Sequence, residues 1–214
     1  CSPYEHHDIK DNNKTIIVDE HYLEKIENSI VKDWNLVYSD YIYAHMLVNN
    51  ETGEIFDLAD KIRIAHSYDM LVLVDATQAL GNIPINVKEL DADFMSFSFH
   101  KVHAPKGIGA LYVRKELKEK MIPLIYGSQE YNLRGGTSNV PYIVGAGLAV
   151  IRAINEMQEK QIHCALLKEK IISILNKNEI PFIINEGKDN ISSILNIALK
   201  DVTGDSMILA LDNY

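Results

Sequence analysis

The sequence predicts an α/β fold: a mostly parallel sheet flanked by helices, followed by part of a small α/β domain. Strand-like segments alternate with helical ones, an order that implies right-handed crossovers and parallel pairing. The continuous apolar run Leu71 to Val74 is typical of a parallel strand buried on both faces. A helical stretch from Pro141 to about Asn176 is too long for one ordinary helix and is expected to join two domains. We therefore expect a large domain over residues 1–150, and a linking helix with an incomplete small domain over 151–214.

Periodicity and turn residues predict the individual elements. Apolar residues at helical spacing indicate an amphipathic helix over residues 20–32. Asp57 is expected to cap a helix from Leu58 to about Ser67. A short helix is also predicted over residues 204–211, in the incomplete small domain. The predicted strands cover residues 15–18, 41–48, 71–74, 94–97, 110–113, 181–184 and 193–199.

Composition excludes several classes of protein. The net charge of -9 repels phosphate backbones, and no basic stripe offsets it, so we expect no nucleic-acid partner. No apolar run of about 18 residues is present, so we expect no membrane span. The two cysteines, Cys1 and Cys164, form neither a disulfide framework nor a metal-ligand cluster, which favours the cytoplasm. Residue 1 is not Met and the last helix is short, so we interpret both ends as breaks inside a longer protein.

Polar residues follow three of the predicted strands, where ligands bind in open parallel sheets. Such a set is suited to pyridoxal 5'-phosphate (PLP), which needs a Schiff-base lysine and an acidic partner for its pyridine nitrogen. Lys101 and Asp75 fit these two roles, and His6 or His7 can stack on the ring. Phosphate donors can come from Ser98, His100 and Thr137, and the other polar residues at the strand ends are Asn49, Asn50 and Gln78.

Each residue also has an ordinary structural interpretation. An Asp after a strand is more often a helix cap or turn residue, and a lone lysine such as Lys101 is more often a surface residue. His100 and His103, together with His6 and His7, suggest a metal site as an alternative, but no His-Glu-x-x-His motif or Cys pair accompanies them. Neither Ser98 nor Cys164 has a convincing catalytic triad. The order and spacing of the whole set therefore carry the prediction.

Three motifs contain most of this set. They are V-D-A-T-Q at residues 74–78, M-S-F-S-F-H-K at 95–101 and H-A-P-K-G-I-G-A-L-Y-V-R at 103–114. Together they closely resemble the cysteine desulfurases of the NifS and IscS type, in the class V aminotransferase group of fold type I PLP enzymes. The E-H pair at residues 5–6, the loop at 48–53 and the segment at 133–140 match the same family pattern in the same order.

The resemblance implies a role for each matched position. Lys101 would be the Schiff-base lysine, and Asp75 would bind the pyridine nitrogen. His6 would stack on the ring, and Gln78 would contact the phenolic oxygen, with Asn50 near that oxygen or the substrate. Ser98 and His100 would bind the phosphate. Thr137 would reach the phosphate in the neighbouring subunit, because members of the family are homodimers with active sites at the interface.

The chain also departs from the family pattern. Phe99 stands where the IscS-type pattern usually has Gly. The family's phosphate loop, its nucleophilic cysteine loop and its substrate-binding arginine have no match in these residues, and neither Cys1 nor Cys164 fits the sulfur-accepting cysteine.

The function implied by the resemblance is conversion of L-cysteine to L-alanine. The sulfur would be passed on as a persulfide for iron–sulfur cluster or thio-cofactor assembly, with a sulfur-acceptor or scaffold protein as a partner. We expect these 214 residues by themselves not to complete that cycle. The alternatives are another class V PLP enzyme, such as a selenocysteine lyase or a cysteine lyase-like relative, and a non-catalytic truncated relative.

Overall fold

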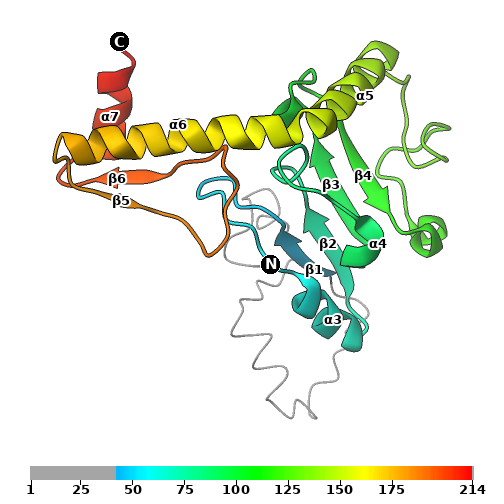
Figure 1. The fold of residues 1–214 in the computed structure, drawn as a ribbon. Helices are drawn as coiled ribbons and strands as arrows, with labels where there is room; N and C mark the ends of the chain where they lie inside the picture. Colours follow the sequence, from blue (N-terminus) through cyan, green and yellow to red (C-terminus); the bar gives the residue numbers. More distant parts are fainter. Residues whose placement is uncertain (1–41, 214) are drawn as a thin grey trace. The chain divides into compact units, whose positions relative to one another are not determined.

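The computed structural model of the chain describes residues 42–213 and divides the chain into two compact units (Figure 1). The described part of the first unit comprises residues 42–47 and 57–154, and that of the second comprises 48–56 and 155–213. The predicted strand at 15–18, the predicted helix at 20–32 and His6 lie outside the described residues. The division of the chain at residue 150 stays a prediction, and nothing in the sequence had indicated that residues 48–56 group with the C-terminal part.

A four-stranded sheet forms the centre of the first unit, in the order β1-β2-β3-β4. Strands β1 (Ile42–Met46), β2 (Leu71–Asp75) and β3 (Phe94–Ser98) are parallel, while β4 (Gly109–Val113) pairs antiparallel with β3. The turn before β4 is too short for a helical crossover, so this strand returns beside β3 in the opposite direction. The mostly parallel sheet predicted from the sequence is confirmed.

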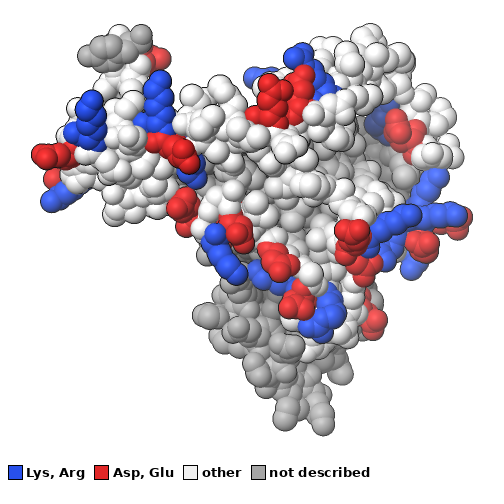
Figure 2. Space-filling view, viewed as in Figure 1, with Lys and Arg blue, Asp and Glu red and all other residues white. Residues whose placement is uncertain are grey.

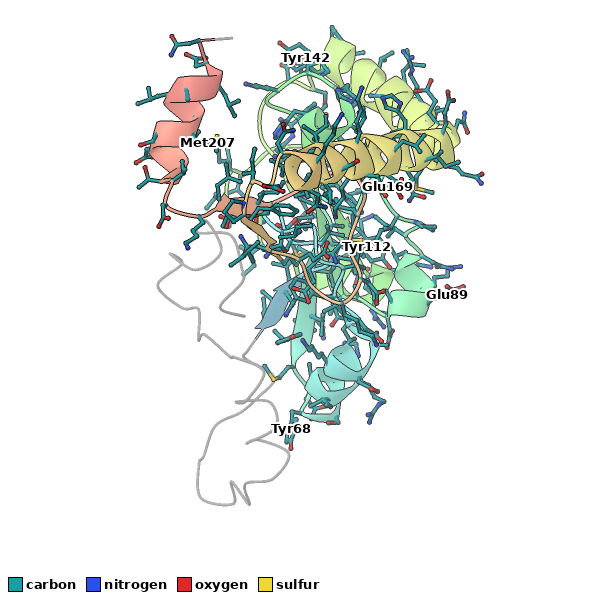
Figure 3. All side chains as sticks on the ribbon, turned by 60° about the vertical axis from the view of Figure 1, so that its left-hand side comes forward. Tyr68, Glu89, Tyr112, Tyr142, Glu169 and Met207 are labelled. Carbon is teal, nitrogen blue, oxygen red and sulfur yellow. The ribbon has the colours of Figure 1, made fainter. Side chains whose placement is uncertain are left out.

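Side chains from the strands and from the first helix make the core of this unit. Helix α3 (Ala59–Ser67) packs against β2 and buries Ile62 and Ala65. In Figure 3, Tyr68 marks the carboxyl end of this helix. The helix begins after Leu58 rather than after Asp57, but the Asp57 Oδ1 accepts a hydrogen bond from the Ala59 N–H at 3.2 Å. The core residues with at most 5% exposure include Tyr43, Leu58, Ile62, Met70, Val72, Val74 and Met95.

Short helices connect the later strands. Helix α4 (Val87–Leu90) is capped by Asn86, whose side chain accepts from the N–H groups of Lys88 and Glu89. The 3-10 helices η2 (Phe99–Val102) and η3 (Lys115–Lys120) follow β3 and β4. None of these three elements was predicted, because four to six residues are too few to show a helical period.

The long helical stretch predicted from Pro141 to Asn176 is two helices. Helix α5 (Val140–Asn155) belongs to the first unit up to Ile154, and α6 (Met157–Lys177) belongs to the second, with Glu156 between them. No single helix within residues 42–213 is long and apolar enough to cross a membrane. Only when α5 and α6 are counted together, as a pair with a bend between them, do their length and composition reach those of a membrane span.

The second unit combines α6 with a small hairpin and one more helix. Strands β5 (Phe182–Ile184) and β6 (Ile197–Leu199) pair antiparallel, and α7 (Gly204–Leu211) is capped by Thr203. The segment Val48–Phe56 joins this unit through backbone hydrogen bonds from Ile55 N to Asp189 O and from Ile191 N to Gly53 O, at 2.8 and 2.9 Å. Ile191 is only 4% exposed.

Candidate active site

The strand register brings two of the predicted motifs together. Asp75 is the last residue of β2, and its register partner on β3 is Ser96. The Ala76 N–H donates to Ser96 O at 3.0 Å, so the pairing continues one residue past Asp75. Ser98 ends β3 two residues later. The V-D-A-T-Q and M-S-F-S-F-H-K motifs therefore meet at the carboxyl edge of the parallel strands, as the sequence had indicated.

The carboxylate of Asp75 is held in a defined orientation. Its Oδ1 accepts from the Thr77 N–H at 2.9 Å and from the Ser96 hydroxyl at 3.2 Å. Among residues 42–213, no hydrogen bond reaches the other oxygen, Oδ2. Asp75 is half-buried, so its free oxygen can serve a ligand at this edge of the sheet.

The segment after β3 turns at once into the 3-10 helix η2. Ser98 is its N-cap, and the Ser98 hydroxyl lies 2.8 Å from Nδ1 of His100. Val102 is buried and anchors the turn, whereas Lys101 and His100 are exposed. One short turn therefore presents a hydroxyl, an imidazole and an amine together.

Close packing joins this turn to the segment that carries Gln78. Gly81 has a φ of +71°, and a Cβ at this position would lie 2.9 Å from the Ala153 Cβ and 3.1 Å from Val102 Cγ1. A side chain at residue 81 would therefore push the η2 turn away from the turn after β2. The backbone of Gln78 is fixed in the same region, because its carbonyl accepts from Asn82 Nδ2 at 2.8 Å.

Phe99 replaces a family glycine without backbone strain. Positive φ values occur at eight described non-glycine residues, and Phe99 is not one of them. Its N–H donates to Ile108 O at 3.3 Å, and its carbonyl accepts from the Ala104 N–H at 3.1 Å. The turn between Ser98 and His100 therefore accommodates a phenylalanine in an ordinary conformation.

Two of the predicted residues, Asn50 and Thr137, belong to other segments of the chain than these two motifs. Asn50 is exposed and belongs to the second unit, next to Asn49, whose Oδ1 accepts from the N–H groups of Glu51 and Thr52. Thr137 is an exposed residue of the first unit. The structure thus brings Asp75, Ser98, His100 and Lys101 to the carboxyl ends of two adjacent strands, and the roles expected of Asn50 and Thr137 stay predictions.

Ser96 is the residue of this region that the sequence analysis did not single out. It contributes a hydroxyl directly to Asp75, and it was passed over as a strand residue. A signal was present in the M-S-F-S run: Ser96 and Ser98 alternate with Met95 and Phe97, so both serines lie on one face of the strand.

An ionic network centred on the buried Asp93 occupies the opposite end of the same strands. Asp93, which precedes β3 and is 4% exposed, accepts at Oδ2 from the Val72 N–H at 2.8 Å, and His66 Nε2 lies 2.9 Å from the same oxygen. The Arg114 guanidinium lies between Asp93 Oδ1, 2.9 Å from Nε, and Asp91 Oδ1, 2.6 Å from Nη2. Because this network lies at the amino end of β3, it holds the sheet and does not contribute to the candidate site.

Charge and burial act in opposite directions on Arg114. Burial works to lower the pKa of its guanidinium, but the hydrogen bond with Asp91 and the negative charges of Asp93 and Asp91 outweigh burial and raise that pKa. Arg114 therefore stays charged within this network. Elsewhere on the face shown in Figure 2, Lys and Arg are interspersed with Asp and Glu, without a single-sign stripe.

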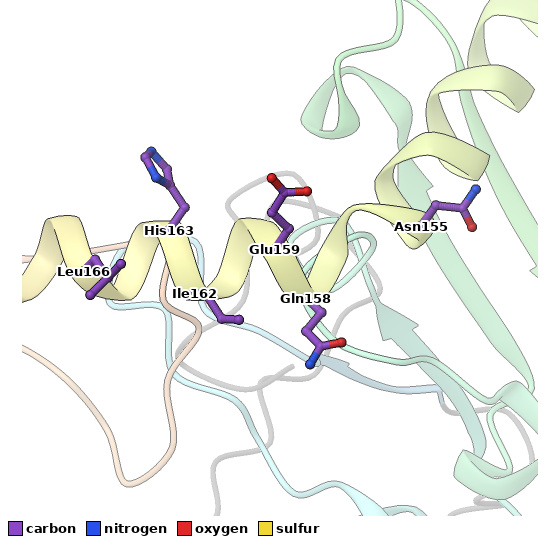
Figure 4. A pocket seen from close by; sticks show the side chains of 6 residues that line it. All are labelled: Asn155, Gln158, Glu159, Ile162, His163 and Leu166. Atoms are coloured by element: carbon purple, nitrogen blue, oxygen red, sulfur yellow. The ribbon is translucent and has the colours of Figure 1, made fainter.

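The second unit contains a hollow whose lining residues lie later in the sequence than the candidate site. It has a volume of about 520 Å³ and is lined by Asn155 and by five residues of α6 (Figure 4). Because nearly all of its lining comes from one helix, it has no convergent polar groups from separate elements. Residues 42–213 also contain no group of three or more His, Cys, Asp or Glu side chains placed to hold a metal ion.

Comparison with known proteins identifies the class to which this fold and site belong. The profile of the Aminotransferase class-V family matches residues 19–214, so the chain belongs to that family. Within it, the chain is similar to proteins named cysteine desulfurase IscS. It is 36% identical over 190 residues to the one from Buchnera aphidicola subsp. Acyrthosiphon pisum (strain 5A), covering 88% of this chain and 46% of that protein. It is 40% identical over 169 residues to the one from Dictyoglomus turgidum (strain DSM 6724 / Z-1310), covering 78% and 42%.

Solved structures show the same relationship. A structure named NifS-like protein superimposes with a TM-score of 0.78 at 34% identity, over 90% of this chain and 51% of that one. The expected resemblance to NifS and IscS proteins and the expected fold are thus confirmed. The chain spans about half the length of the relatives that it matches.

Proposed function

We propose that this chain carries the PLP-binding part of a cysteine desulfurase, which converts L-cysteine to L-alanine and passes the sulfur on as a persulfide. The observation that supports the proposal most is the grouping of Asp75, Ser98, His100 and Lys101 at the carboxyl ends of two parallel strands. The reaction is inferred from the names of relatives that are called cysteine desulfurase and share 36–40% identity with the chain. Iron–sulfur cluster or thio-cofactor assembly, and a sulfur-acceptor or scaffold partner, are part of the same proposal.

The donor set fits PLP chemically. The cofactor needs an amine for covalent attachment, a carboxylate facing its pyridine nitrogen and hydrogen-bond donors for its phosphate. Lys101 supplies the amine, and Asp75 supplies Oδ2, the oxygen that accepts no hydrogen bond from the described residues. Ser98 and His100, 2.8 Å apart, supply a hydroxyl and an imidazole on one turn. When bound, PLP serves as an electron sink for the carbanion of the substrate.

Each residue of the chain would then have a defined task. Lys101 would hold the cofactor and afterwards move a proton at the substrate carbon, because its amine is released when the substrate replaces it. Asp75 would keep the pyridine nitrogen protonated. Gln78 would contact the phenolic oxygen, and Asn50 would lie near that oxygen or the substrate. His6, outside the described residues, would stack on the ring.

A homodimer is part of the proposal. Large apolar side chains are exposed in the first unit, both in the segment after η3 and along α5, and apolar patches of this kind mark interaction surfaces. Ile122 and Leu124 are 82% and 96% exposed, and Leu148 on α5 is 68% exposed. Thr137 lies in the same segment, between these two groups, which fits a role for Thr137 in the neighbouring subunit's phosphate site.

Borohydride trapping tests the proposal. We expect the 214-residue chain, incubated with PLP, to develop the yellow absorbance of a Schiff base, and reduction to leave one adduct, on the peptide that contains Lys101. Lys101→Ala should abolish the adduct. Lys106→Ala is the matched control, because Lys106 is also an exposed lysine, in the loop that follows η2, and its replacement should leave the adduct unchanged.

The outcome separates the proposal from a non-catalytic relative. Labelling of several exposed lysines to the same extent, or an adduct that persists in Lys101→Ala, would contradict a PLP site at Lys101. An adduct at Lys101 without alanine formation from cysteine would locate the cofactor in this chain and the turnover in a longer protein or assembly. In a longer protein or assembly that turns over, alanine formation from cysteine, compared with selenocysteine at equal concentration, distinguishes a desulfurase from a selenocysteine lyase.

A further inference from the structure

The surroundings of Asp75 differ on its two sides. The register places Met46 of β1 beside Asp75 and Ser96 of β3 on the other side. Register partners on parallel strands direct their side chains to the same face of the sheet. Met46 is 3% exposed and offers a thioether, a weak acceptor that cannot donate to a carboxylate. Ser96 is therefore the neighbour across the strands that can restrain this carboxylate.

Both hydrogen bonds to Asp75 end on the same oxygen. The Thr77 N–H, at 2.9 Å, comes from the turn that Asp75 itself begins, and such a local bond restrains mainly the position of Oδ1. The Ser96 hydroxyl, at 3.2 Å, approaches from the neighbouring strand. Two donors from different directions fix the position of Oδ1, which restricts rotation about both the χ1 and the χ2 bond of Asp75, and they leave Oδ2 without either donor.

We propose that Ser96 is a positioning residue, whose hydroxyl fixes the carboxylate of Asp75 so that Oδ2 is presented to the ligand at the strand ends. In the proposed function, on which this inference rests for its ligand, Oδ2 receives the N–H of the PLP pyridine ring. Ser96 does not touch the cofactor in this role. It acts through Asp75, and its contribution depends on Asp75 being present.

The first test needs no cofactor. Side-chain rotamers of Asp75 are measured by NMR scalar couplings in the full chain, in Ser96→Ala and in Ser96→Thr, which keeps a hydroxyl and suits a strand. We expect one rotamer in the unmodified chain and in Ser96→Thr, and averaged couplings in Ser96→Ala. Ser67→Ala removes a hydroxyl that bonds only within α3, to Ile64 O at 2.7 Å, and should leave the couplings unchanged. A single, unchanged rotamer in Ser96→Ala would overturn the proposal, because the Thr77 bond alone would then suffice.

The second test measures PLP affinity by absorbance titration in a double-mutant cycle. Loss of one hydrogen bond to a carboxylate should weaken binding about tenfold in Ser96→Ala, and Ser96→Thr should restore it. In an Asp75→Ala background, Ser96→Ala should have no further effect, since the residue through which Ser96 acts is gone. An equal loss in both backgrounds would show that Ser96 supports the sheet generally and would contradict the proposal.

The two tests distinguish this inference from the proposed function. If the unmodified chain forms no adduct at Lys101 while the Asp75 couplings change in Ser96→Ala, the PLP assignment fails and the positioning role stands. If the adduct forms and the couplings do not change, the positioning role fails and the PLP assignment stands.

Discussion

Replacement of Asp93 by alanine should destabilise the first unit far more than loss of an ordinary surface charge. Asp93 is 4% exposed, and its carboxylate accepts from Val72 N–H at 2.8 Å and pairs with Arg114 and His66. An unpaired, buried N–H at Val72 costs about 1–3 kcal/mol. In Asp93→Ala, Arg114 keeps Asp91 as a partner, and its side chain is 30% exposed. Loss of the Asp93 carboxylate from Arg114 should therefore add only about 1 kcal/mol to the destabilisation, well below the cost of breaking a fully buried ion pair.

The expected loss is therefore about 3 kcal/mol, a large share of the roughly 5–15 kcal/mol that stabilises a typical domain. Native-state hydrogen exchange at the Val74 amide, which does not bond to Asp93, measures it without assuming that the two units unfold together. At about 1.4 kcal/mol per factor of ten, exchange should accelerate by roughly 150-fold.

The control is Asp60→Ala. Asp60 also pairs with an arginine, Arg63, at 3.2 Å, but both side chains are exposed. Removal of the Asp60 carboxylate should change the opening free energy, measured by exchange of the core amides, by no more than about 0.5 kcal/mol. Similar effects in Asp93→Ala and Asp60→Ala would refute the reasoning, since burial and the bond to Val72 would then contribute nothing.

Three other features can be tested by substitution: the close approach at Gly109, the hydrogen bonds of Asn49 and the raised pKa of Arg114. Gly109 is the register partner of Ser98, and Gly109→Ala would place a Cβ 2.5 Å from Phe97 O. This substitution should lower the free energy of unfolding, measured by urea titration, by about 1–3 kcal/mol. Gly147→Ala is the control: no atom lies within 4 Å of a Cβ at this position on α5, so it should be neutral or stabilising by up to about 1 kcal/mol. Asn49→Ala removes the acceptor of two N–H groups in the 49–54 loop and should speed amide exchange at Glu51 and Thr52 about tenfold, with no change at Val72. The pKa of Arg114 is raised in the folded chain, so the stability that Arg114 contributes is fully present below its unfolded-state pKa and is lost only as pH rises through the higher folded value. The difference in free energy of unfolding between the unmodified chain and Arg114→Met should therefore stay constant from about pH 7 to about pH 10. A decline of this difference within that window would contradict the raised pKa.

The elements that the sequence predicted well are those whose pattern is local. The run Leu71 to Val74 became β2, with Val72 and Val74 at most 1% exposed, and the helix over residues 204–211 has the predicted bounds. The break at Glu156 was missed because it contains neither Gly nor Pro, so apolar periodicity continues on both sides. The grouping of residues 48–56 with the C-terminal unit depends on partners more than 130 positions away, which no local window contains.

For the candidate site, the motifs located the strand ends, because Asp75 and Ser98 terminate apolar runs. Which side chains bond to one another depends on register, and register between strands is set by packing across the sheet. The pairing of Asp75 with Ser96 therefore became visible only in the structure. The same is true of Arg114, which ends a family motif in the sequence and pairs in the fold with one buried carboxylate, Asp93, and one exposed carboxylate, Asp91.

The hydrogen bond from Asn196 Nδ2 to Glu51 O, at 3.3 Å, joins residues 145 positions apart in the chain. During synthesis at about 5–20 residues per second, the loop that carries Asn50 therefore waits on the order of ten seconds or more for the segment that it pairs with. During that interval strands β2, β3 and β4 are synthesised and can form the sheet with β1, while the second unit cannot close. Release of a nascent chain after β4 but before residue 189 should thus yield a folded sheet with a loose 48–56 loop, and proteolysis at that loop would report how far synthesis had proceeded.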